Sequence, residues 1–176
     1  MASREIRPIR VEGNIAYVTL TRGYEAVIDA VDVPLVDGFN WYAHEALRSD
    51  GTLRTVYAIR DATDRRGRRK RVALHRIISG YSTLDVDHKD GDGLNNCRSN
   101  LRAATRAQNI HNASIRCTNK SGVKGVHWAK EKGKWRAQIR CNGARKTLGY
   151  FNCRTAAAIA YANESRRLHG EFARIA

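Results

Sequence analysis

The stretch DHKDGDGLNNCRSNLRAATRAQNIHN, residues 87–112, decides the fold of the central part of the chain and holds its most reactive polar side chains. Asp87 and His88 are adjacent, and Asn100 and Asn109 follow at wider spacing. A carboxylate, an imidazole and two amides can hold one divalent metal ion and one general base against a phosphodiester. The stretch therefore predicts a hydrolytic site.

Hydrophobicity and turn residues predict the elements that carry this site. Residues 84–87 and 101–104 are expected to be short strands, and the Gly-, Asn- and Asp-rich segment 89–99 between them is expected to be a loop. Thr105 is a suitable N-cap for a helix that runs to about Asn112. The predicted order is strand, loop, strand, helix.

The side chains suggest distinct roles in phosphodiester hydrolysis. His88 suits the general base, because imidazole titrates near neutral pH. Asp87 and Asn109 offer the hard oxygen ligands that magnesium or manganese prefers. Asn100 lies at the end of the loop, where its amide can tie the loop shut and fix the orientation of the base. His111 is a competing ligand candidate that ranks below Asn109, because at helical spacing it points elsewhere.

Composition points to a polyanionic partner. The chain of 176 residues has a formal net charge of +15 and an isoelectric point near 10.3. Residues 113–176 contain 14 Lys and Arg against 3 Asp and Glu. Such an excess favours nucleic acid through counterion release.

Other sequence features narrow the class of protein. The four cysteines are widely spaced and include no CxxC pair, which argues against a zinc knuckle. Neither a signal peptide nor a transmembrane segment is visible. We therefore expect a reduced protein in the host cytoplasm.

The regions on either side of residues 84–112 differ in pattern. Residues 6–80 are expected to be rich in strands, with a hairpin around Thr21-Arg22-Gly23, strands at 39–43 and 55–59, and a short helix or strand at 72–79. They include a basic run, DRRGRRKR at 64–71. This run is compatible with three roles, namely a solvated hairpin tip, a nuclear-import signal or an arm that contacts phosphates. Residues 113–120 are predicted to be a linker. Residues 121–176 predict three strands, with turns at Lys132-Gly133 and Asn142-Gly143, and then a helix from about Arg154 to His169 that ends at Gly170.

The central motifs resemble those of the HNH endonucleases. The resemblance rests on DH at 87–88, NLR at 100–102, QN at 108–109 and LHR at 74–76. It implies the ββα-metal (His-Me finger) fold, with Asp87 and Asn109 as metal ligands, His88 as the base and Asn100 as a structural clamp. Asn109 occupies the third motif position, where the family often has His. This replacement of His by Asn resembles the phage and intron-encoded branch of the family.

A second resemblance covers residues 121–176. SGVKGVHW, GKWRAQI, LGYF and AAAIAYANES, in this order, resemble the ethylene-response-factor-type (apetala-two) DNA-binding domain. That resemblance implies a three-stranded sheet that contacts DNA through Lys124, His127, Arg136, Gln138, Arg140, Arg145 and Thr147. Gln138 replaces an often acidic residue and Lys132 replaces a tryptophan, so base preference does not carry over.

Together these observations predict an α+β protein. A nuclease domain is expected at 1–112, with its ββα core at about 84–112, and a DNA-binding domain at 121–176. The expected activity is hydrolysis of double-stranded DNA with one Mg²⁺ or Mn²⁺ per site, leaving 5′-phosphate and 3′-hydroxyl ends, as in a phage or mobile-element homing nuclease. Either a monomer or a homodimer is compatible with this expected activity. The alternatives are a non-catalytic sequence-specific DNA-binding regulator and an RNA-directed or structure-specific nuclease.

Overall fold

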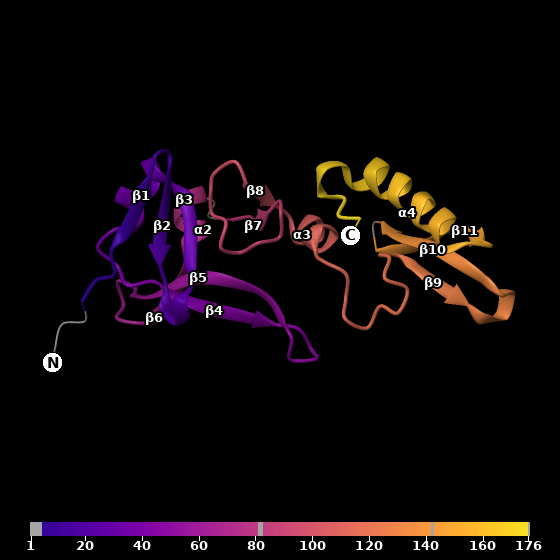
Figure 1. Cartoon of the computed structure of the whole chain (residues 1–176), viewed down its shortest axis with the longest axis horizontal. Coiled ribbons are helices and arrows are strands. Elements are labelled where there is room, and N and C mark those ends of the chain that lie inside the picture. Colours follow the sequence, from indigo (N-terminus) through magenta and orange to yellow (C-terminus); the bar gives the residue numbers. More distant parts are fainter. Residues whose placement is uncertain (1–4, 81–82, 142, 176) are drawn as a thin grey trace. The chain divides into compact units, whose positions relative to one another are not determined.

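Several small antiparallel sheets and a few helices make up the chain, which is of the mixed α+β class (Figure 1). The computed structural model describes residues 5–80, 83–141 and 143–175. The chain divides into two units, residues 1–106 and 107–176. The elements of the first unit are β1 (Ile9–Glu12), β2 (Ile15–Thr19), η1 (Thr21–Gly23), β3 (Glu25–Asp29), η2 (Ala30–Asp32), α1 (Val33–Val36), β4 (Tyr42–Leu47), β5 (Leu53–Thr63), β6 (Arg69–Ala73), α2 (Leu74–Ser79), β7 (Asp85–His88) and β8 (Leu101–Ala104).

The helix α3 (Arg106–Asn112) begins at the boundary between the units. The remaining elements belong to the second unit: β9 (Val126–Ala129), η3 (Lys130–Lys132), β10 (Lys134–Cys141), β11 (Ala144–Phe151), α4 (Arg154–His169) and η4 (Gly170–Phe172). None of the helices in the described ranges is both long and apolar enough to cross a membrane.

The first unit contains two three-stranded sheets, with strand orders β1-β2-β3 and β4-β5-β6. The predicted hairpin around residues 21–23 is confirmed, since β2 and β3 pair antiparallel on either side of η1. Alternate residues of β2 and β3 are buried, which is the period-2 pattern of a strand with one face on the core. Ala16, Val18 and Ile28 are among these core residues.

Two predicted boundaries in this region differ from the structure. The strand expected at residues 39–43 begins only at Tyr42, because Trp41 is buried before it and donates its indole N–H to the Val36 carbonyl. Residues 72–79, expected to be one helix or one strand, contain the end of β6 and the whole of α2. The chain changes conformation at Leu74, which is fully buried.

The β7–β8 hairpin shares one hydrophobic core with these sheets. Val86 of β7 and Leu101 of β8 belong to the same buried cluster as Ile28 of β3 and as Leu74 and Ile78 of α2. The predicted strand at 101–104 is confirmed at both ends, and the one at 84–87 is displaced by one residue. Residues 6–80 therefore support the hairpin that carries Asp87 and His88.

The loop between β7 and β8 is also pinned to the N-terminal sheets through its backbone. The Val27 N–H donates to Leu94 O at 2.8 Å, and the Asn96 N–H donates to Val27 O at 2.7 Å. The Gly93 N–H donates to Thr55 Oγ1 at 2.9 Å. A side chain at Gly93 would overlap the Val56 carbonyl and the Tyr57 ring, so glycine allows this close approach.

The second unit is a three-stranded antiparallel sheet, ordered β11-β10-β9, that packs against α4 (Figure 1). The three predicted strands and the predicted helix are confirmed, and α4 has the expected bounds. Gly170 follows the helix with φ of 52°, a value that favours glycine. Asn142 of the predicted turn lies outside the described residues.

Candidate active site

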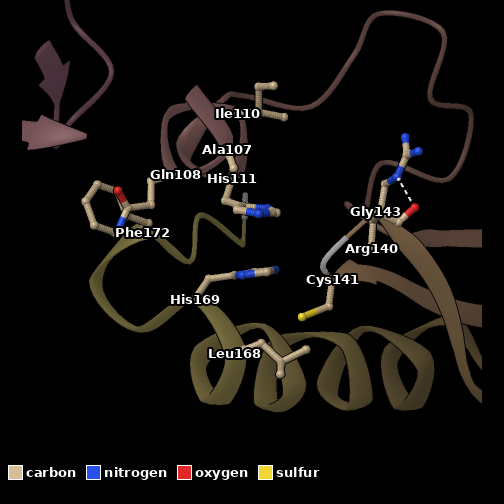
Figure 2. A pocket seen from close by; sticks show the side chains of 10 residues that line it. All are labelled: Ala107, Gln108, Ile110, His111, Arg140, Cys141, Gly143, Leu168, His169 and Phe172. Carbon is tan, nitrogen blue, oxygen red and sulfur yellow. Dashed lines mark hydrogen bonds between the residues drawn. The ribbon is translucent and has the colours of Figure 1, made fainter. Parts of the chain in front are cut away.

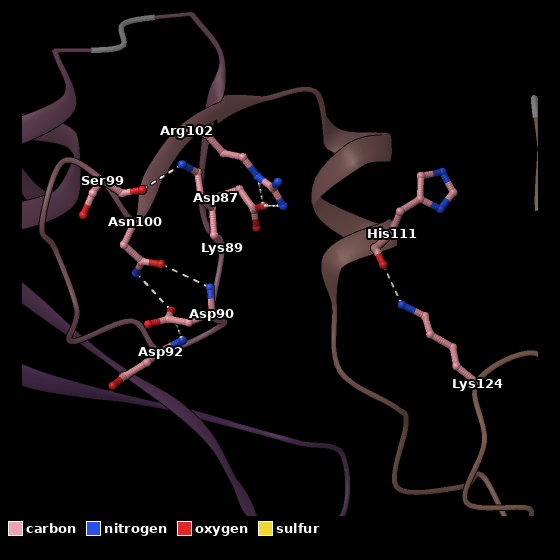
Figure 3. Close-up of polar contacts among 9 residues, drawn as sticks. All are labelled: Asp87, Lys89, Asp90, Asp92, Ser99, Asn100, Arg102, His111 and Lys124. Carbon is pink, nitrogen blue, oxygen red and sulfur yellow. Dashed lines mark hydrogen bonds and ion pairs between the residues drawn. The ribbon is translucent and has the colours of Figure 1, made fainter. Parts of the chain in front are cut away.

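Asp87 and His88 lie side by side at the end of β7, and both are almost fully buried, with 4% and 6% of their surface exposed. Asp87 is directly opposite Arg102 of β8 in the strand pairing. Arg102 donates from Nε to Asp87 Oδ2 at 2.8 Å, and its Nη2 lies 2.7 Å from the same oxygen (Figure 3). A carboxylate buried this deeply needs such a partner, because an uncompensated buried charge is strongly destabilising.

The ring of His88 contacts a residue that the sequence did not identify. Nε2 of His88 lies 3.3 Å from Oδ1 of Asn96, which is fully buried. Nδ2 of Asn96 donates to Leu94 O at 2.8 Å and to Gly93 O at 3.4 Å, and these bonds turn the oxygen end of the amide toward the ring. An amide oxygen only accepts, so Nε2 carries the ring proton of neutral His88 and Nδ1 carries the lone pair.

Two aromatic rings pack around His88 and help to keep it neutral. The ring centroid of His75, on α2, is 5.1 Å from that of His88, and the Tyr57 ring is 5.9 Å from it. Burial lowers the pKa of His88, although the hydrogen bond that His88 donates to Asn96 and the nearby carboxylates oppose the shift. Burial, aided by His88 and Arg76, lowers the pKa of His75 to about 3. A neutral imidazole is the form that can accept a proton.

The Asn100 side chain forms three hydrogen bonds within the β7–β8 loop (Figure 3). Its Oδ1 accepts from the Asp90 N–H at 3.1 Å, and its Nδ2 donates to Asp90 Oδ1 at 3.0 Å and to Asn95 O at 2.8 Å. Burial tends to raise the pKa of Asp90, but the hydrogen bonds from Asp92, Asn100 and Asn95 outweigh it and lower the pKa. Asp90 and Asp92 therefore organise the loop.

Asn109, the predicted second metal ligand, lies on α3 within the second unit. The structure thus brings Asp87, His88 and Asn100 together in the first unit, and the pairing of Asp87 with Asn109 stays a prediction. Among the described residues, no group of three or more His, Cys, Asp or Glu side chains is arranged to hold a metal ion. The Asp87 carboxylate offers a hard oxygen of the kind that Mg²⁺ accepts as a ligand.

His111, the competing ligand candidate, stacks on His169 of α4 with ring centroids 3.6 Å apart (Figure 2). Both rings line a cavity of about 440 Å³ in the second unit, together with the apolar Ile110, Leu168 and Phe172. Burial and the neighbouring His169 lower the pKa of His111. This contact gives His111 a packing role.

The sheet of the second unit has one covered face and one open face. Ala137 and Ile139 of β10 are buried against α4. Residues paired directly across antiparallel strands point to the same side of a sheet. The alternate residues of β10 and their partners therefore share the open face: His127, Arg136, Gln138, Arg140, Arg145 and Thr147. Six of the seven residues predicted to contact DNA lie on this face.

Lys124, the seventh, has a different environment. Its ammonium group is partly buried and donates to the backbone carbonyl of His111 at 2.6 Å (Figure 3). It also donates to the carbonyl of Ala113 at 2.8 Å. Burial, with a contribution from Arg174, lowers its pKa to about 8. We therefore assign Lys124 a structural role and leave it out of the open face.

Two residues beside the site, Asn96 and Arg102, were missed by the reasoning from sequence. Strand alternation could have identified Arg102, because pairing of residues 84–87 with 101–104 places it opposite Asp87. Asn96 has no such signal, since its contact with His88 depends on the path of an irregular loop.

Comparison with known proteins identifies the family of the segment that carries Asp87 and His88. A family model described as HNH endonuclease matches residues 72–111. Protein 3.8 of Escherichia phage T7 is 36% identical over 98 residues, which are 56% of this chain and 78% of that protein. The uncharacterized HNH endonuclease L560 of Acanthamoeba polyphaga mimivirus is 36% identical over 110 residues, 58% of this chain and 56% of that protein.

No solved structure matches the chain. The matched family model ends at residue 111, so the resemblance of residues 121–176 to the ethylene-response-factor-type domain rests on sequence motifs and element order alone. The chain belongs to the family of protein 3.8 of phage T7, and its residues 72–111 are an HNH endonuclease domain.

Proposed function

We propose that the chain is a metal-dependent endonuclease that hydrolyses duplex DNA with His88 as the general base. The observation that carries this proposal is the adjacent, buried pair of Asp87 and His88 at the end of β7, inside the matched HNH domain. The family match supports nuclease activity in general. The homing type and the phage or mobile-element setting are part of the proposal.

His88 prepares the attacking water in this scheme. Its pKa is lowered by burial, so the ring is neutral near pH 7 and accepts a proton from water. Asn96 holds the ring so that Nδ1 is the accepting nitrogen. Attack on phosphorus in line with the 3′-oxygen leaves a 5′-phosphate and a 3′-hydroxyl.

Asp87 and Asn109 would hold the divalent ion, Mg²⁺ or Mn²⁺, that HNH nucleases generally use. When bound, such an ion supplies positive charge that stabilises the leaving oxygen. Arg102 holds the Asp87 carboxylate in place through its two contacts with Oδ2. The Asn100 side chain bonds to Asp90 and Asn95 and keeps the two ends of the β7–β8 loop together.

The open face of the second unit is proposed to bind the duplex. It presents Arg136, Arg140 and Arg145 on one side of the sheet, and α4 covers the other side. Arginine side chains on a strand can contact both phosphates and base edges. Each chain has one proposed catalytic site, so a double-strand break requires a dimer or two successive nicks.

A plasmid assay tests the proposed activity. Incubation of supercoiled plasmid with the protein and Mg²⁺ or Mn²⁺ should give nicked or linear DNA with 5′-phosphate ends. His88→Ala should reduce the rate by at least about 100-fold, in the range of lost general-base catalysis, while DNA affinity stays unchanged. His44→Ala is the matched control, because His44 is an exposed histidine of β4 in the same unit.

An intact plasmid after incubation with the wild-type protein would contradict the proposed activity and favour the DNA-binding regulator. Equal cutting by His88→Ala and wild type would show that another group is the base. Faster cleavage of RNA than of duplex DNA would reassign the substrate.

A further inference from the structure

The hairpin tip between β5 and β6 is the most strongly charged exposed segment of the first unit. Residues 64–71, here named the basic arm, contain six Lys or Arg residues and a single carboxylate, Asp64. All six cationic side chains belong to exposed residues. Like charges at this density repel one another unless a polyanion lies against them.

Asp64 holds the turn of the basic arm in one conformation. Its Oδ1 accepts from the N–H groups of Arg66 and Arg68, both at 2.9 Å, and its Oδ2 accepts from Nε of Arg68 at 2.9 Å. Gly67 occupies the left-handed position of the turn, with φ of 74°. An ordered turn loses less conformational freedom when it binds a partner.

The chain leads directly from the basic arm to the candidate site. β6 ends at Ala73, and His75 on the following helix lies with its ring 5.1 Å from that of His88. Six residues span at most about 21 Å, and the His75 side chain with its ring contact adds about 9 Å, so Arg69 lies within about 30 Å of the proposed base. This reach is shorter than one helical turn of B-DNA, about 34 Å.

We propose that the basic arm binds the phosphate backbone of duplex DNA within one helical turn of the bond that is cut. The inference rests on the proposed function, because it takes the substrate of the His88 site as its partner. The contacts are to phosphates, which position the duplex without reading its sequence. The arm and the open face of the second unit thus have separate tasks.

Salt-dependent binding tests the basic arm. In the His88→Ala background, a 30-base-pair duplex is titrated with protein between 50 and 200 mM salt, with and without Arg69→Gln and Lys70→Gln. Loss of two phosphate contacts should reduce the slope of log Kd against log salt by about 2 and weaken binding similarly for unrelated sequences.

The matched control is Arg10→Gln with Arg22→Gln. These two exposed residues already form ion pairs with Glu12, Glu25 and Glu45, so the variant has the same net charge without loss of a phosphate contact. Its slope should equal that of the parent. An unchanged slope in the arm variant, or an equal fall in both variants, would overturn the proposal.

Ethylation interference then locates the contacts. The phosphates that the arm variant no longer requires should lie within one helical turn of the position cut by the wild-type protein. Lost contacts farther away, or a loss of affinity seen only with duplex RNA, would also overturn the inference. Absence of plasmid cleavage by the wild type would instead contradict the proposed function, since the binding titration needs no catalysis.

Discussion

The ring of His88 is positioned by residues from three separate segments. Asn96 accepts from Nε2 within the loop, His75 packs from α2 and Tyr57 packs from β5. The sequence predicted that Asn100 would both close the loop and orient the base. The structure divides these tasks, since Asn100 bonds to the loop and Asn96 contacts the ring.

Asn96→Ala should reduce kcat by about 10- to 100-fold, as loss of an orienting partner commonly does, and leave KM for DNA unchanged. The reason is that His88 would lose the contact that selects its tautomer. Single-turnover cleavage measures the effect. The double variant Asn96→Ala with His88→Ala should be no slower than His88→Ala alone, because Asn96 acts through that ring. An additive fall would show that Asn96 has another role.

Proton binding by His75 on unfolding should lower the free energy of unfolding at acidic pH. Its folded pKa of about 3 lies below the unfolded value of 6.5, so the unfolded state binds more protons between these values. The contribution of His75 to the free energy of unfolding is therefore fully present above pH 6.5 and decreases as the pH falls toward 3. At pH 5 the loss is about 2 kcal/mol.

Urea unfolding at pH 7.5 and pH 5 measures this effect. His75→Leu should lose about 2 kcal/mol less than the wild type between the two pH values, since leucine has no proton to bind. Equal losses in the two proteins would mean that His75 is accessible to protons in the folded state.

At the scale of elements, strand pairing decides which side chains are available to a partner. Arg145 and Lys146 are neighbours on β11 but point to opposite sides of the sheet. Arg145 is opposite Arg140 on the open face, whereas Lys146 is opposite the buried Ile139 and bonds to Glu164 of α4 at 3.0 Å. The two residues form a matched pair with equal charge.

Arg145→Ala should weaken DNA binding and lower the salt slope by about 0.9, because one phosphate contact is lost. Lys146→Ala should leave the slope unchanged, since its ammonium already pairs with Glu164 on the covered side. Fluorescence anisotropy with a labelled duplex at several salt concentrations compares them. Equal slopes for the two variants would remove the open face from the DNA contact surface.

At the scale of the whole molecule, the chain has two hydrophobic cores. One contains Ile28, Leu74 and Leu101, with other residues of the first unit, and the second contains Val126, Ile139 and Tyr161. Each buried cluster is built from residues of one unit. Cooperative unfolding follows the shared core, so each unit is expected to unfold as its own transition.

Calorimetry of the full chain should show two transitions. Ile139→Ala should lower only one of them, by at least about 5 °C, because a buried Ile→Ala change costs about 2–5 kcal/mol. Ile28→Ala, an equally buried isoleucine of the first unit, should lower only the other. A single transition displaced by both variants would show that the units unfold together.

Much of the secondary structure could be predicted because it depends on neighbouring residues. Alternation identified β10, and the apolar spacing and final glycine identified α4. The predicted start of one strand was wrong where the backbone takes an irregular path, since Trp41 is buried before Tyr42 and bonds to the nearby Val36 carbonyl. The roles of Asp87, His88, Asn100 and Asn109 came from their spacing and stay predictions.

By itself, the sequence determined the strand–loop–strand–helix order, the position of the HNH motif and the excess of positive charge. These properties are local or additive, so they can be read residue by residue. Only the tertiary structure decided that Asn96 contacts His88 and that β3 and β5 hold the β7–β8 loop. The first contact depends on the path of an irregular loop. The others join segments far apart in the chain, which the packing of one shared core brings together.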